Sequence, residues 1–288
     1  MIEDDGPLGC PCRGRHMALA WIYHAPPEGE TPFPHLARRP YRREVRRCRV
    51  CHHFVLDPGV ELEELYRGGY ADATYGDAMR ATFERIVALP PERSDNAGRV
   101  RRVMTFRDGA RSADGGSPRV LDVGSGLAVF PWALLREGWR VWALDPDPRQ
   151  VAHAREVAGV PAICADFMTA QDLGTYDVVT LNKVLEHVPD PVGMLARTTP
   201  LLAPGGAVYV EVPDGAAASA DGPGREEFFI EHLHAFSPES LAMLVRRAGL
   251  EPLRIERLRE PSGKYTLVAF AGADGTGQPH AVPGVPGG

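Results

Sequence analysis

The sequence predicts an α/β fold: a parallel sheet with helices on both faces, preceded by a small Cys/His-rich module. Three observations lead to this prediction. Strand-like apolar runs alternate with helical runs through residues 118–271, a pattern typical of parallel sheets. A glycine-rich turn follows the first of these strands and opens a helix. Four of the five cysteines lie within the first 51 residues.

The chain divides into four parts by composition. Residues 1–60 are rich in Cys, His, Arg and Pro and resemble a zinc-binding module, and residues 61–117 form a helical lid and linker. Residues 118–271 form the α/β domain. Residues 272–288 are rich in Gly and Pro, so we expect a disordered tail.

Composition and charge limit the classes of protein. With 44% apolar and 24% charged residues, the chain should be globular. The net charge of -6 gives no overall attraction to nucleic acid or acidic membranes. No stretch approaches the ~20 apolar residues that span a bilayer, and the N-terminus lacks a signal-peptide pattern. We expect a cytoplasmic protein with reduced cysteines and a small-molecule substrate; the oligomeric state stays open.

Ahead of the sheet, hydrophobic spacing predicts two helices. The first covers residues 62–89 and stops at Pro90-Pro91, because proline lacks the N–H that a helix interior needs. The second covers residues 97–106, and residues 107–118 form a loop rich in Gly, Ser and Asp.

Within the α/β domain, Gly and Pro mark where elements begin and end. Gly138 closes the first helix, and Pro131 falls in that helix's first turn, where a missing N–H costs little. Residues 204–206 (Pro-Gly-Gly) end a later helix, and Ser237 is the N-cap of the last one. The expected elements are strand 120–123, helix 128–137, strand 140–144, helix 148–158, strands 161–165 and 176–181, helix 191–202, strand 207–212, helix 238–248, and strands 253–258 and 264–271 as a hairpin.

The turn after the first strand indicates a nucleoside cofactor. Gly124 and Gly126 let the backbone approach a ligand closely. Asp145 ends the next strand, about 20 residues later, where a carboxylate can accept both hydroxyls of an adenosine ribose. The alternative is a structural βα turn in some other α/β protein.

Two details favour S-adenosylmethionine (SAM) over a dinucleotide. A dinucleotide fingerprint needs Gly or Ala where this chain has Val129, with the helix N-terminus clear for a pyrophosphate. A SAM site holds no phosphate, and Asp122, two residues before the first glycine, can contact the cofactor's amino-acid end.

Several motifs in order resemble the class I SAM-dependent methyltransferases, and imply their Rossmann-like sheet and SAM as cofactor. The run 120–128 resembles their motif I, with Ala128 for the usual third glycine, and Asp145 matches the ribose-binding acid. By the same resemblance, Asp166 and Phe167 contact adenine. The runs 176–191 and 204–213 resemble the fourth-strand and fifth-strand motifs, and we expect Asn182 to join the cofactor site.

Acid–base residues follow the fourth and fifth strands, at the sheet edge where ligands bind. His187 ends the run Asn182 to His187, and Glu231 and His232 lie in a segment with two aromatic residues and a second histidine, His234. A histidine can accept the proton of a methyl acceptor, and a carboxylate can orient it. The alternatives are that His187 only packs beside the cofactor and that Glu231 and His234 cap the next helix.

The pairing of these segments is similar to the zinc-domain C-methyltransferases that modify nucleotide-bound deoxysugars. That resemblance makes His187, Glu231 and His232 the acid–base set, with Phe229 where that subgroup has a tyrosine. The chain matches the subgroup without its further C-terminal domain.

The N-terminal cysteines predict a structural zinc site. Cys48 and Cys51 form a Cys-x-x-Cys knuckle, and Cys10 and Cys12 form a tighter pair. One of that tighter pair could be replaced as a ligand by a histidine; the candidates are His16, His52 and His53. The alternative is a metal-free segment with reduced thiols.

Two features remain ambiguous in the sequence. Tyr70 and Tyr75 match tyrosines that related enzymes place in a lid over SAM, although ordinary packing explains them nearly as well. Seven arginines crowd into residues 38–49, as a solvated basic face or as a grip on a substrate phosphate or carboxylate.

The sequence therefore predicts methyl transfer from SAM to a small molecule, such as a natural product or sugar, at carbon or oxygen. Two other functions stay open: an NAD-dependent Rossmann oxidoreductase and a non-catalytic SAM-binding module.

Overall fold

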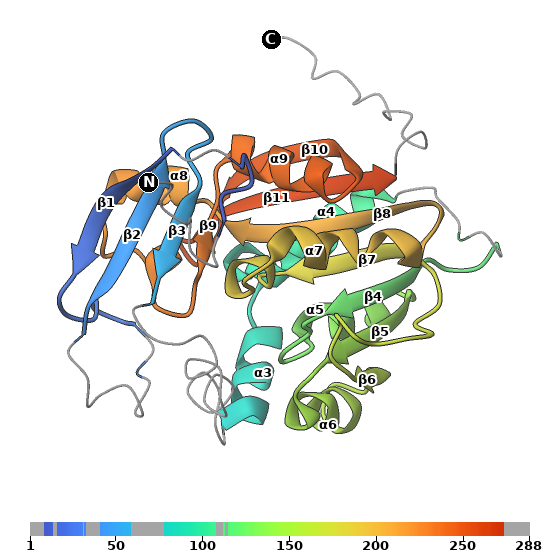
Figure 1. Ribbon diagram of the computed structural model, residues 1–288. Coiled ribbons are helices and arrows are strands. Elements are labelled where there is room, and N and C mark those ends of the chain that lie inside the picture. Colours follow the sequence, from blue (N-terminus) through green and yellow to red (C-terminus); the bar gives the residue numbers. More distant parts are fainter. Residues whose placement is uncertain are drawn as a thin grey trace, which may run out of the picture.

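The computed structural model describes residues 9–13, 16–30, 32, 41–58, 78–107, 112 and 115–273. These residues form two sheets, a small one built mainly from the N-terminal segment and a large one from the rest (Figure 1). The predicted lid residues Tyr70 and Tyr75, the first two arginines of the run (Arg38 and Arg39) and residues 274–288 of the predicted tail lie outside the described residues.

The large sheet has the strand order β10-β11-β8-β7-β4-β5-β6. The strands β4 to β8 run parallel to one another. The strands β10 and β11 form the expected antiparallel hairpin, and β11 also pairs antiparallel with β8. The strands are β4 (Arg119–Val123), β5 (Arg140–Asp145), β6 (Ala162–Cys164), β7 (Tyr176–Asn182), β8 (Leu202–Pro213), β10 (Leu250–Arg259) and β11 (Tyr265–Ala273). This is the Rossmann-like class I methyltransferase sheet that the sequence predicts.

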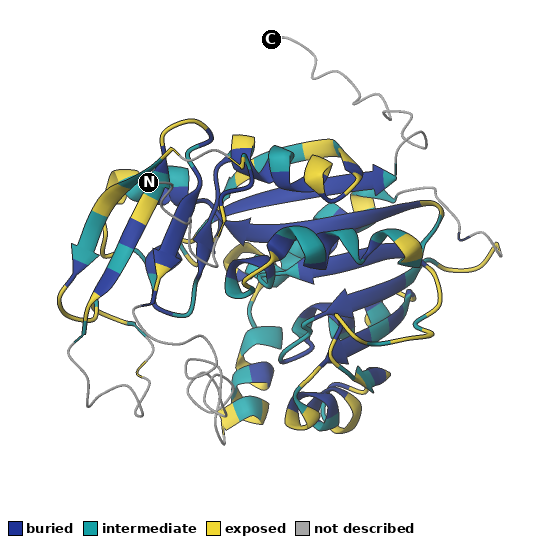
Figure 2. Ribbon diagram, in the orientation of Figure 1, coloured by how far each residue is buried: buried dark blue, intermediate teal, exposed yellow. Residues whose placement is uncertain are grey.

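Helices cover both faces of this sheet because successive strand residues point to opposite sides. Leu121 and Val123 of β4 belong to one cluster of buried side chains, and Val120 belongs to another. Figure 2 shows that the strands of the large sheet are mostly buried. On the first face lie α7 (Pro191–Ala196) and α9 (Pro238–Arg247); on the second lie α4 (Asp95–Phe106), α5 (Val129–Arg136) and α6 (Pro148–Glu156), with α3 (Met79–Val87) packed beside them.

Most predicted elements are confirmed, but their ends differ. The predicted helix 191–202 is wrong in its second half: α7 stops at Ala196, and a 3-10 turn over Thr199–Leu201 follows. Pro200 explains this, because it has no N–H to donate to the carbonyl oxygen of Ala196, four residues earlier. The hairpin strands are longer than expected, since β10 and β11 pair from Leu250↔Ala273 to Arg259↔Tyr265.

The small sheet is the feature that the hydrophobic pattern misses. It has the order β1-β2-β3-β9, and its strands are β1 (Met17–Tyr23), β2 (Arg43–Cys48), β3 (Phe54–Asp57) and β9 (His234–Ala235). The last of these comes from the far end of the α/β domain, and Phe228 also packs into the small sheet's core. The small sheet therefore includes residues about 180 positions apart in the sequence.

Short helices fill the connections near the carboxyl edge of the large sheet. They are η3 (Pro91–Arg93), η4 (Leu185–His187), α8 (Gly215–Ala218), η6 (Ser219–Asp221) and η7 (Glu226–Phe228), in addition to η5, the 3-10 turn after α7.

Candidate active site

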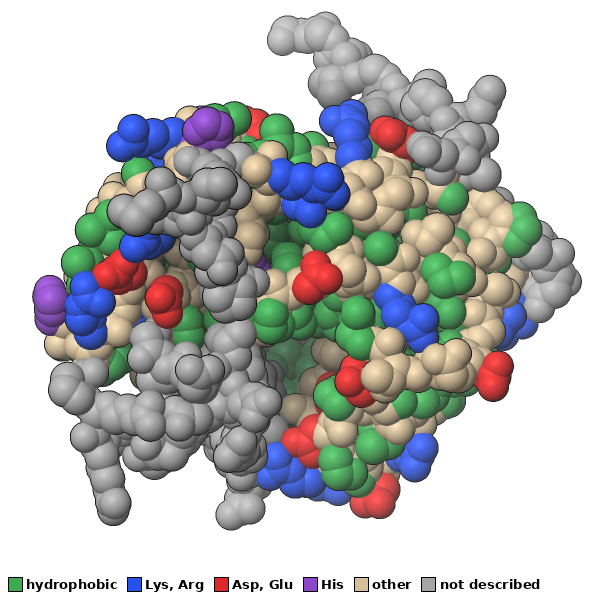
Figure 3. Space-filling model, in the orientation of Figure 1, with side chains coloured by type: hydrophobic (Ala, Val, Ile, Leu, Met, Phe, Trp, Pro, Cys, Tyr) green, Lys and Arg blue, Asp and Glu red, His purple; other side chains and the backbone are tan. Residues whose placement is uncertain are grey.

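One large pocket, of about 1420 Å³, opens at the carboxyl ends of β4, β5 and β7. The chain order of the strands reverses there: β4 continues into β5 on one side and lies beside β7 on the other. Ligands of open α/β sheets bind at such a point. Figure 3 shows the surface hollowed near the middle of this face.

The glycine turn lines one wall of the pocket through its backbone. Gly124 and Gly126 have φ angles of 68° and 50°, which favour glycine. The N–H groups of Gly124 and Ser125 both donate to the carbonyl oxygen of Leu144, at 2.8 and 3.3 Å. Ala128 takes the left-handed conformation too, at φ 55°, so a small side chain is accepted where related proteins have a third glycine.

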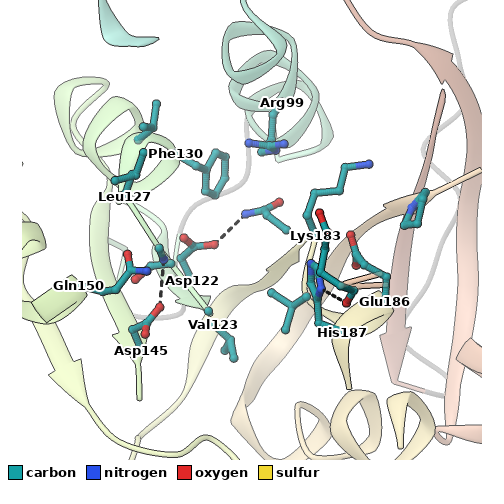
Figure 4. Close-up of a pocket in the computed structure, with 18 of the residues that line it drawn as sticks. Arg99, Asp122, Val123, Leu127, Phe130, Asp145, Gln150, Lys183, Glu186 and His187 are labelled. Carbon is teal, nitrogen blue, oxygen red and sulfur yellow. Dashed lines mark hydrogen bonds between the residues drawn. The ribbon is translucent and has the colours of Figure 1, made fainter. Parts of the chain in front are cut away.

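The two predicted cofactor acids lie at the ends of neighbouring strands (Figure 4). Asp145 accepts hydrogen bonds from the N–H groups of Gly126 (3.0 Å) and Asp147 (2.9 Å). Asp122 accepts from the Thr180 hydroxyl (2.5 Å) and from the amide of Asn182 (2.7 Å). Burial raises the pKa of both carboxyl groups, that of Asp122 to about 6.

Three further predicted cofactor residues, Asp166, Phe167 and Asn182, also line this pocket. Asp166 is exposed and accepts from the Met168 N–H, whereas Phe167 is buried at the pocket's edge with the Arg197 guanidinium 5.9 Å from its ring. Among the described residues, the buried oxygens Asn182 Oδ1 and Gln150 Oε1 have no hydrogen-bond partner. Because buried polar atoms normally have partners, these acceptors fit a ligand with hydroxyl and amino groups, as a nucleoside cofactor has.

The structure brings the three predicted acid–base residues together. His187 Nδ1 lies 2.8 Å from the carbonyl oxygen of Glu231, and His232 Nδ1 lies 3.0 Å from that of Glu227. The two imidazole rings are 5.0 Å apart. Because a carbonyl only accepts, each Nδ1 is the protonated nitrogen and each Nε2 carries the basic lone pair. Burial lowers the pKa of both histidines, so both are neutral at pH 7.

Two further residues lie in the site that were not among the residues predicted for it from the sequence. Glu186 is buried beside His187, and its Oε2 has no hydrogen-bond partner among the described residues. Arg99 of α4 reaches the pocket and donates to Glu211 through Nε (2.8 Å) and an amino group (2.5 Å). Glu186 belongs to the run that the sequence marks, but only the packing of α4 over the sheet brings Arg99 there.

Comparison with known proteins now gives the family. Residues 78–255, more than half of the chain, match the family model described as a methyltransferase domain. The chain belongs to this methyltransferase family. The prediction of a class I SAM-dependent methyltransferase is thereby confirmed, and the match decides against the NAD-dependent oxidoreductase.

Known relatives of the methyltransferase agree with this assignment. It is 32% identical over 168 residues to a ubiquinone biosynthesis O-methyltransferase of Ralstonia nicotianae, covering 52% of this chain and 70% of that protein. A match of 38% identity to the namesake enzyme of Vibrio parahaemolyticus covers 32% of this chain and 42% of that one. The fold resembles magnesium protoporphyrin IX methyltransferase of Synechocystis PCC 6803, solved with bound SAH (TM-score 0.51, 16% identity, 69% of this chain and 97% of that one).

Within the described parts of the methyltransferase, no helix is long and apolar enough to cross a membrane.

The four N-terminal cysteines converge at one point of the methyltransferase. The Sγ of Cys10 lies 3.2 Å from that of Cys12 and 3.0 Å from that of Cys51, and Cys12 Sγ lies 3.6 Å from Cys48 Sγ. None of the four forms a disulfide bond. Tetrahedral zinc–thiolate bonds of about 2.3 Å place sulfurs roughly 3.8 Å apart, so this donor set fits zinc. His53 instead pairs with His234, at 3.1 Å between ring nitrogens.

Gly124 of the methyltransferase should tolerate no side chain. A Cβ there would lie 2.7 Å from Val184 Cγ2, in addition to the strain of φ 68°. We expect Gly124→Ala to weaken SAM binding at least about tenfold, because the turn must shift away from Val184. Gly205 is the matched control, since it has φ 72° but nothing within 4 Å of its Cβ position. Calorimetric titration with SAM checks this; equal affinities of the two variants would contradict it.

The buried carboxyl of Glu186 should make stability depend on pH. Burial raises its pKa from 4.5 to about 7. The folded state therefore binds this proton more tightly than the unfolded state, and stability falls as pH rises from about 4.5 to 7. A rise of this size corresponds to about 3 kcal/mol. Glu186→Gln should remove that decline and be the more stable protein at pH 8, whereas exposed Glu137→Gln should change nothing. Urea unfolding at pH 5 and 8 measures both; parallel pH curves would refute the assignment.

Proposed function

We propose that this methyltransferase transfers the SAM methyl group to an oxygen or carbon of a small molecule, with His187, Glu231 and His232 as its acid–base set. The observation that carries the proposal is the state of the two histidines. Each has Nδ1 fixed on a backbone carbonyl and a lowered pKa, which makes Nε2 a base at neutral pH.

The residues on the opposite side of the pocket are suited to hold SAM. Asp145 can accept the ribose hydroxyls, Asp166 and Phe167 border the space for adenine, and the backbone of the glycine turn permits close approach. Asp122 and Asn182 present oxygens toward the amino-acid end, where the Arg99 guanidinium can meet a carboxylate. Bound SAM supplies an electrophilic methyl group on a positively charged sulfur.

The chain's own contribution to the chemistry is orientation and proton transfer. His187 and His232 both line the pocket, and Figure 4 shows His187 across it from Asp145, so an acceptor bound between these two sides can present its hydroxyl or acidic C–H to the histidines. The Nε2 lone pair of one histidine accepts that proton as the methyl bond forms, and the Glu231 carboxylate stabilises the resulting imidazolium. General-base catalysis of this kind contributes about 10²–10⁴-fold.

The known relatives and the cysteine site favour different acceptors. Two relatives are named ubiquinone biosynthesis O-methyltransferases, which favours a hydroxyl group of a small molecule as acceptor. The four cysteines and the set of His187, Glu231 and His232 instead favour the deoxysugar C-methyltransferases, as the second candidate. In both cases we propose that Cys10, Cys12, Cys48 and Cys51 hold a structural zinc, which leaves no open position for chemistry.

A turnover assay with methyl-labelled SAM tests the proposal. Two probes represent the two acceptor classes, 3,4-dihydroxybenzoate for O-methylation and a dTDP-4-keto-6-deoxysugar for C-methylation. We expect label in one product, and mass spectrometry then locates the methyl group. SAM binding without transfer to either probe would support the non-catalytic alternative, and binding of NAD in place of SAM would overturn the proposal.

A further inference from the structure

A buried ion pair of the small module lies directly behind the acid–base segment, here defined as residues 229–233. Glu30 and Arg43 have only 2% and 1% of their side chains exposed, and their charged atoms lie 2.9 Å apart. Neither residue lines the pocket. Buried charges are costly unless they are paired and hydrogen-bonded, so a buried ion pair in a module of this size indicates a specific role.

The pair is held rigidly by aromatic residues. Tyr41 donates its hydroxyl to Glu30 (2.5 Å) and accepts from Arg43 Nε (2.6 Å). The Arg43 guanidinium also lies 4.4 Å from the centre of the Tyr23 ring, a cation–π contact. Tyr41 and Arg43 thus hold the Glu30 carboxylate, and Tyr23 contacts Arg43 in turn.

Glu30 extends from this cluster to the acid–base segment. Its Oε1 accepts the backbone N–H of Ile230 at 2.8 Å, across 200 residues of sequence. Ile230 precedes Glu231, whose carbonyl oxygen accepts from His187 Nδ1 at 2.8 Å. The carboxylate of Glu30 is therefore connected to the ring that we propose as a base by two short hydrogen bonds and the backbone of two residues, Ile230 and Glu231.

The segment is tied to the rest of the protein on its other side as well. The Leu233 N–H donates to the carbonyl oxygen of Glu186 (2.7 Å), and the Leu56 N–H of β3 donates to that of Leu233 (2.9 Å). The acid–base segment thus lies between the small sheet and η4, and Glu30 holds its beginning.

We propose that the buried Glu30–Arg43 pair positions the acid–base segment, so that the small module is a working part of the active site. Glu30 and Arg43 are positioning residues, because they act through Ile230 and Glu231. The inference rests on the proposed function in one respect, the roles of His187 and Glu231.

The charges of Glu30 and Arg43 also affect the pKa of the Glu231 carboxyl group. The groups that face this carboxyl are His187 from η4 and Glu30 and Arg43 from the small module. Burial raises the pKa of Glu231, Glu30 raises it further, and Arg43 and His187 lower it. Neutralising the two members of the pair should therefore shift this pKa in opposite directions, a signature that general loss of structure does not produce.

Two sets of variants of the full-length, zinc-loaded protein test the inference. The double variant E30L/R43M removes the pair and leaves no buried unpaired charge, which favours folding. The single variants E30Q and R43M change one charge each. The matched control is R42M, because Arg42 immediately precedes β2, has 58% of its side chain accessible and forms an ion pair with Glu44 of that strand.

The readouts do not depend on an identified acceptor. Long-range ¹H–¹⁵N spectra with bound S-adenosylhomocysteine report the tautomer of His187, and ¹³C spectra, assigned with E231Q, follow the titration of Glu231. We expect E30L/R43M to lose the single Nδ1-protonated form of His187 with SAM affinity within about twofold of wild type. E30Q should lower the pKa of Glu231, R43M should raise it, and R42M should resemble wild type.

The inference is overturned if, in all variants, His187 keeps one tautomer and Glu231 keeps its wild-type pKa. It is also overturned if R42M changes the His187 tautomer or the Glu231 pKa as the variants of the pair do. If E30L/R43M does not fold, the test rests on the two single variants: opposite shifts of the Glu231 pKa in E30Q and R43M support the inference, and their absence overturns it. Where wild type methylates one of the probes, kcat of E30L/R43M should fall about tenfold or more with little change in the KM for SAM. Spectral responses without any wild-type turnover would uphold the positioning pair and reject the proposed function.

Discussion

Replacing His187 or His232 by alanine should reduce turnover by about 10²–10⁴-fold, the usual contribution of a positioned general base. SAM affinity should stay within about twofold, because the two acids that we propose for the cofactor, Asp122 and Asp145, lie on β4 and β5 and make no hydrogen bond to either histidine. If one histidine is the base and the other supports it, the double variant should lose scarcely more than the more damaged single variant. The measurement is single-turnover methyl transfer with saturating SAM, alongside calorimetric SAM titration.

Controls separate loss of a base from loss of structure. His24→Ala changes an exposed histidine of the small module and should retain full turnover. Glu231→Gln should lose less than either histidine variant, because the Glu231 contact to His187 runs through its backbone carbonyl, which the substitution keeps. Full turnover by His187→Ala and His232→Ala would remove both histidines from the mechanism and leave them as packing beside the cofactor.

Replacing Cys51 by serine should remove zinc and unfold the small sheet. Cys51 is fully buried, and structural zinc sites contribute about 10–16 kcal/mol of apparent binding free energy. The effect should extend to the active site. The Cys51 carbonyl oxygen accepts from the Ser237 hydroxyl at 2.5 Å, and β9 hydrogen-bonds to β3 immediately after the acid–base segment. We therefore expect loss of turnover together with loss of zinc, whereas the large sheet stays folded.

Zinc content by mass spectrometry, limited proteolysis and thermal unfolding measure this expectation. The control is Cys164→Ser, because Cys164 is exposed at the end of β6 and lies outside the cysteine cluster. An unchanged melting curve for Cys51→Ser, or a wild-type protein that folds and turns over without zinc, would show that the four thiols are not a metal site.

Local sequence was a sufficient guide to the large sheet. Its strands are short apolar runs bounded by Gly or Pro, so Arg119–Val123 and Tyr176–Asn182 could be located within a residue or two. The cofactor acids were predictable for the same reason: Asp122 and Asp145 follow from the turn that lies between their strands. Helix ends were less predictable, as α7 illustrates, because a proline four residues on shortened it.

The small sheet could not be predicted in the same way. Charged residues outnumber apolar ones in β2 (Arg43–Cys48), and two contributors to the small sheet and its core, β9 and Phe228, come from residues far along the chain. A pattern search reads neighbours in sequence, whereas this sheet is defined by pairs such as Phe54↔Ala235.

By itself, the sequence determined the class of fold, the SAM-type cofactor turn and the two cysteine pairs, because each follows from local residue patterns in the chain. Only the tertiary structure decided which ring nitrogen of each histidine faces a backbone carbonyl. The tautomers of His187 and His232 depend on backbone carbonyls that folding brings to them, and the Glu30 carboxylate reaches Ile230 only after two separate segments have packed together. Proton positions and buried charges are set by these distant contacts, and a linear pattern does not contain them.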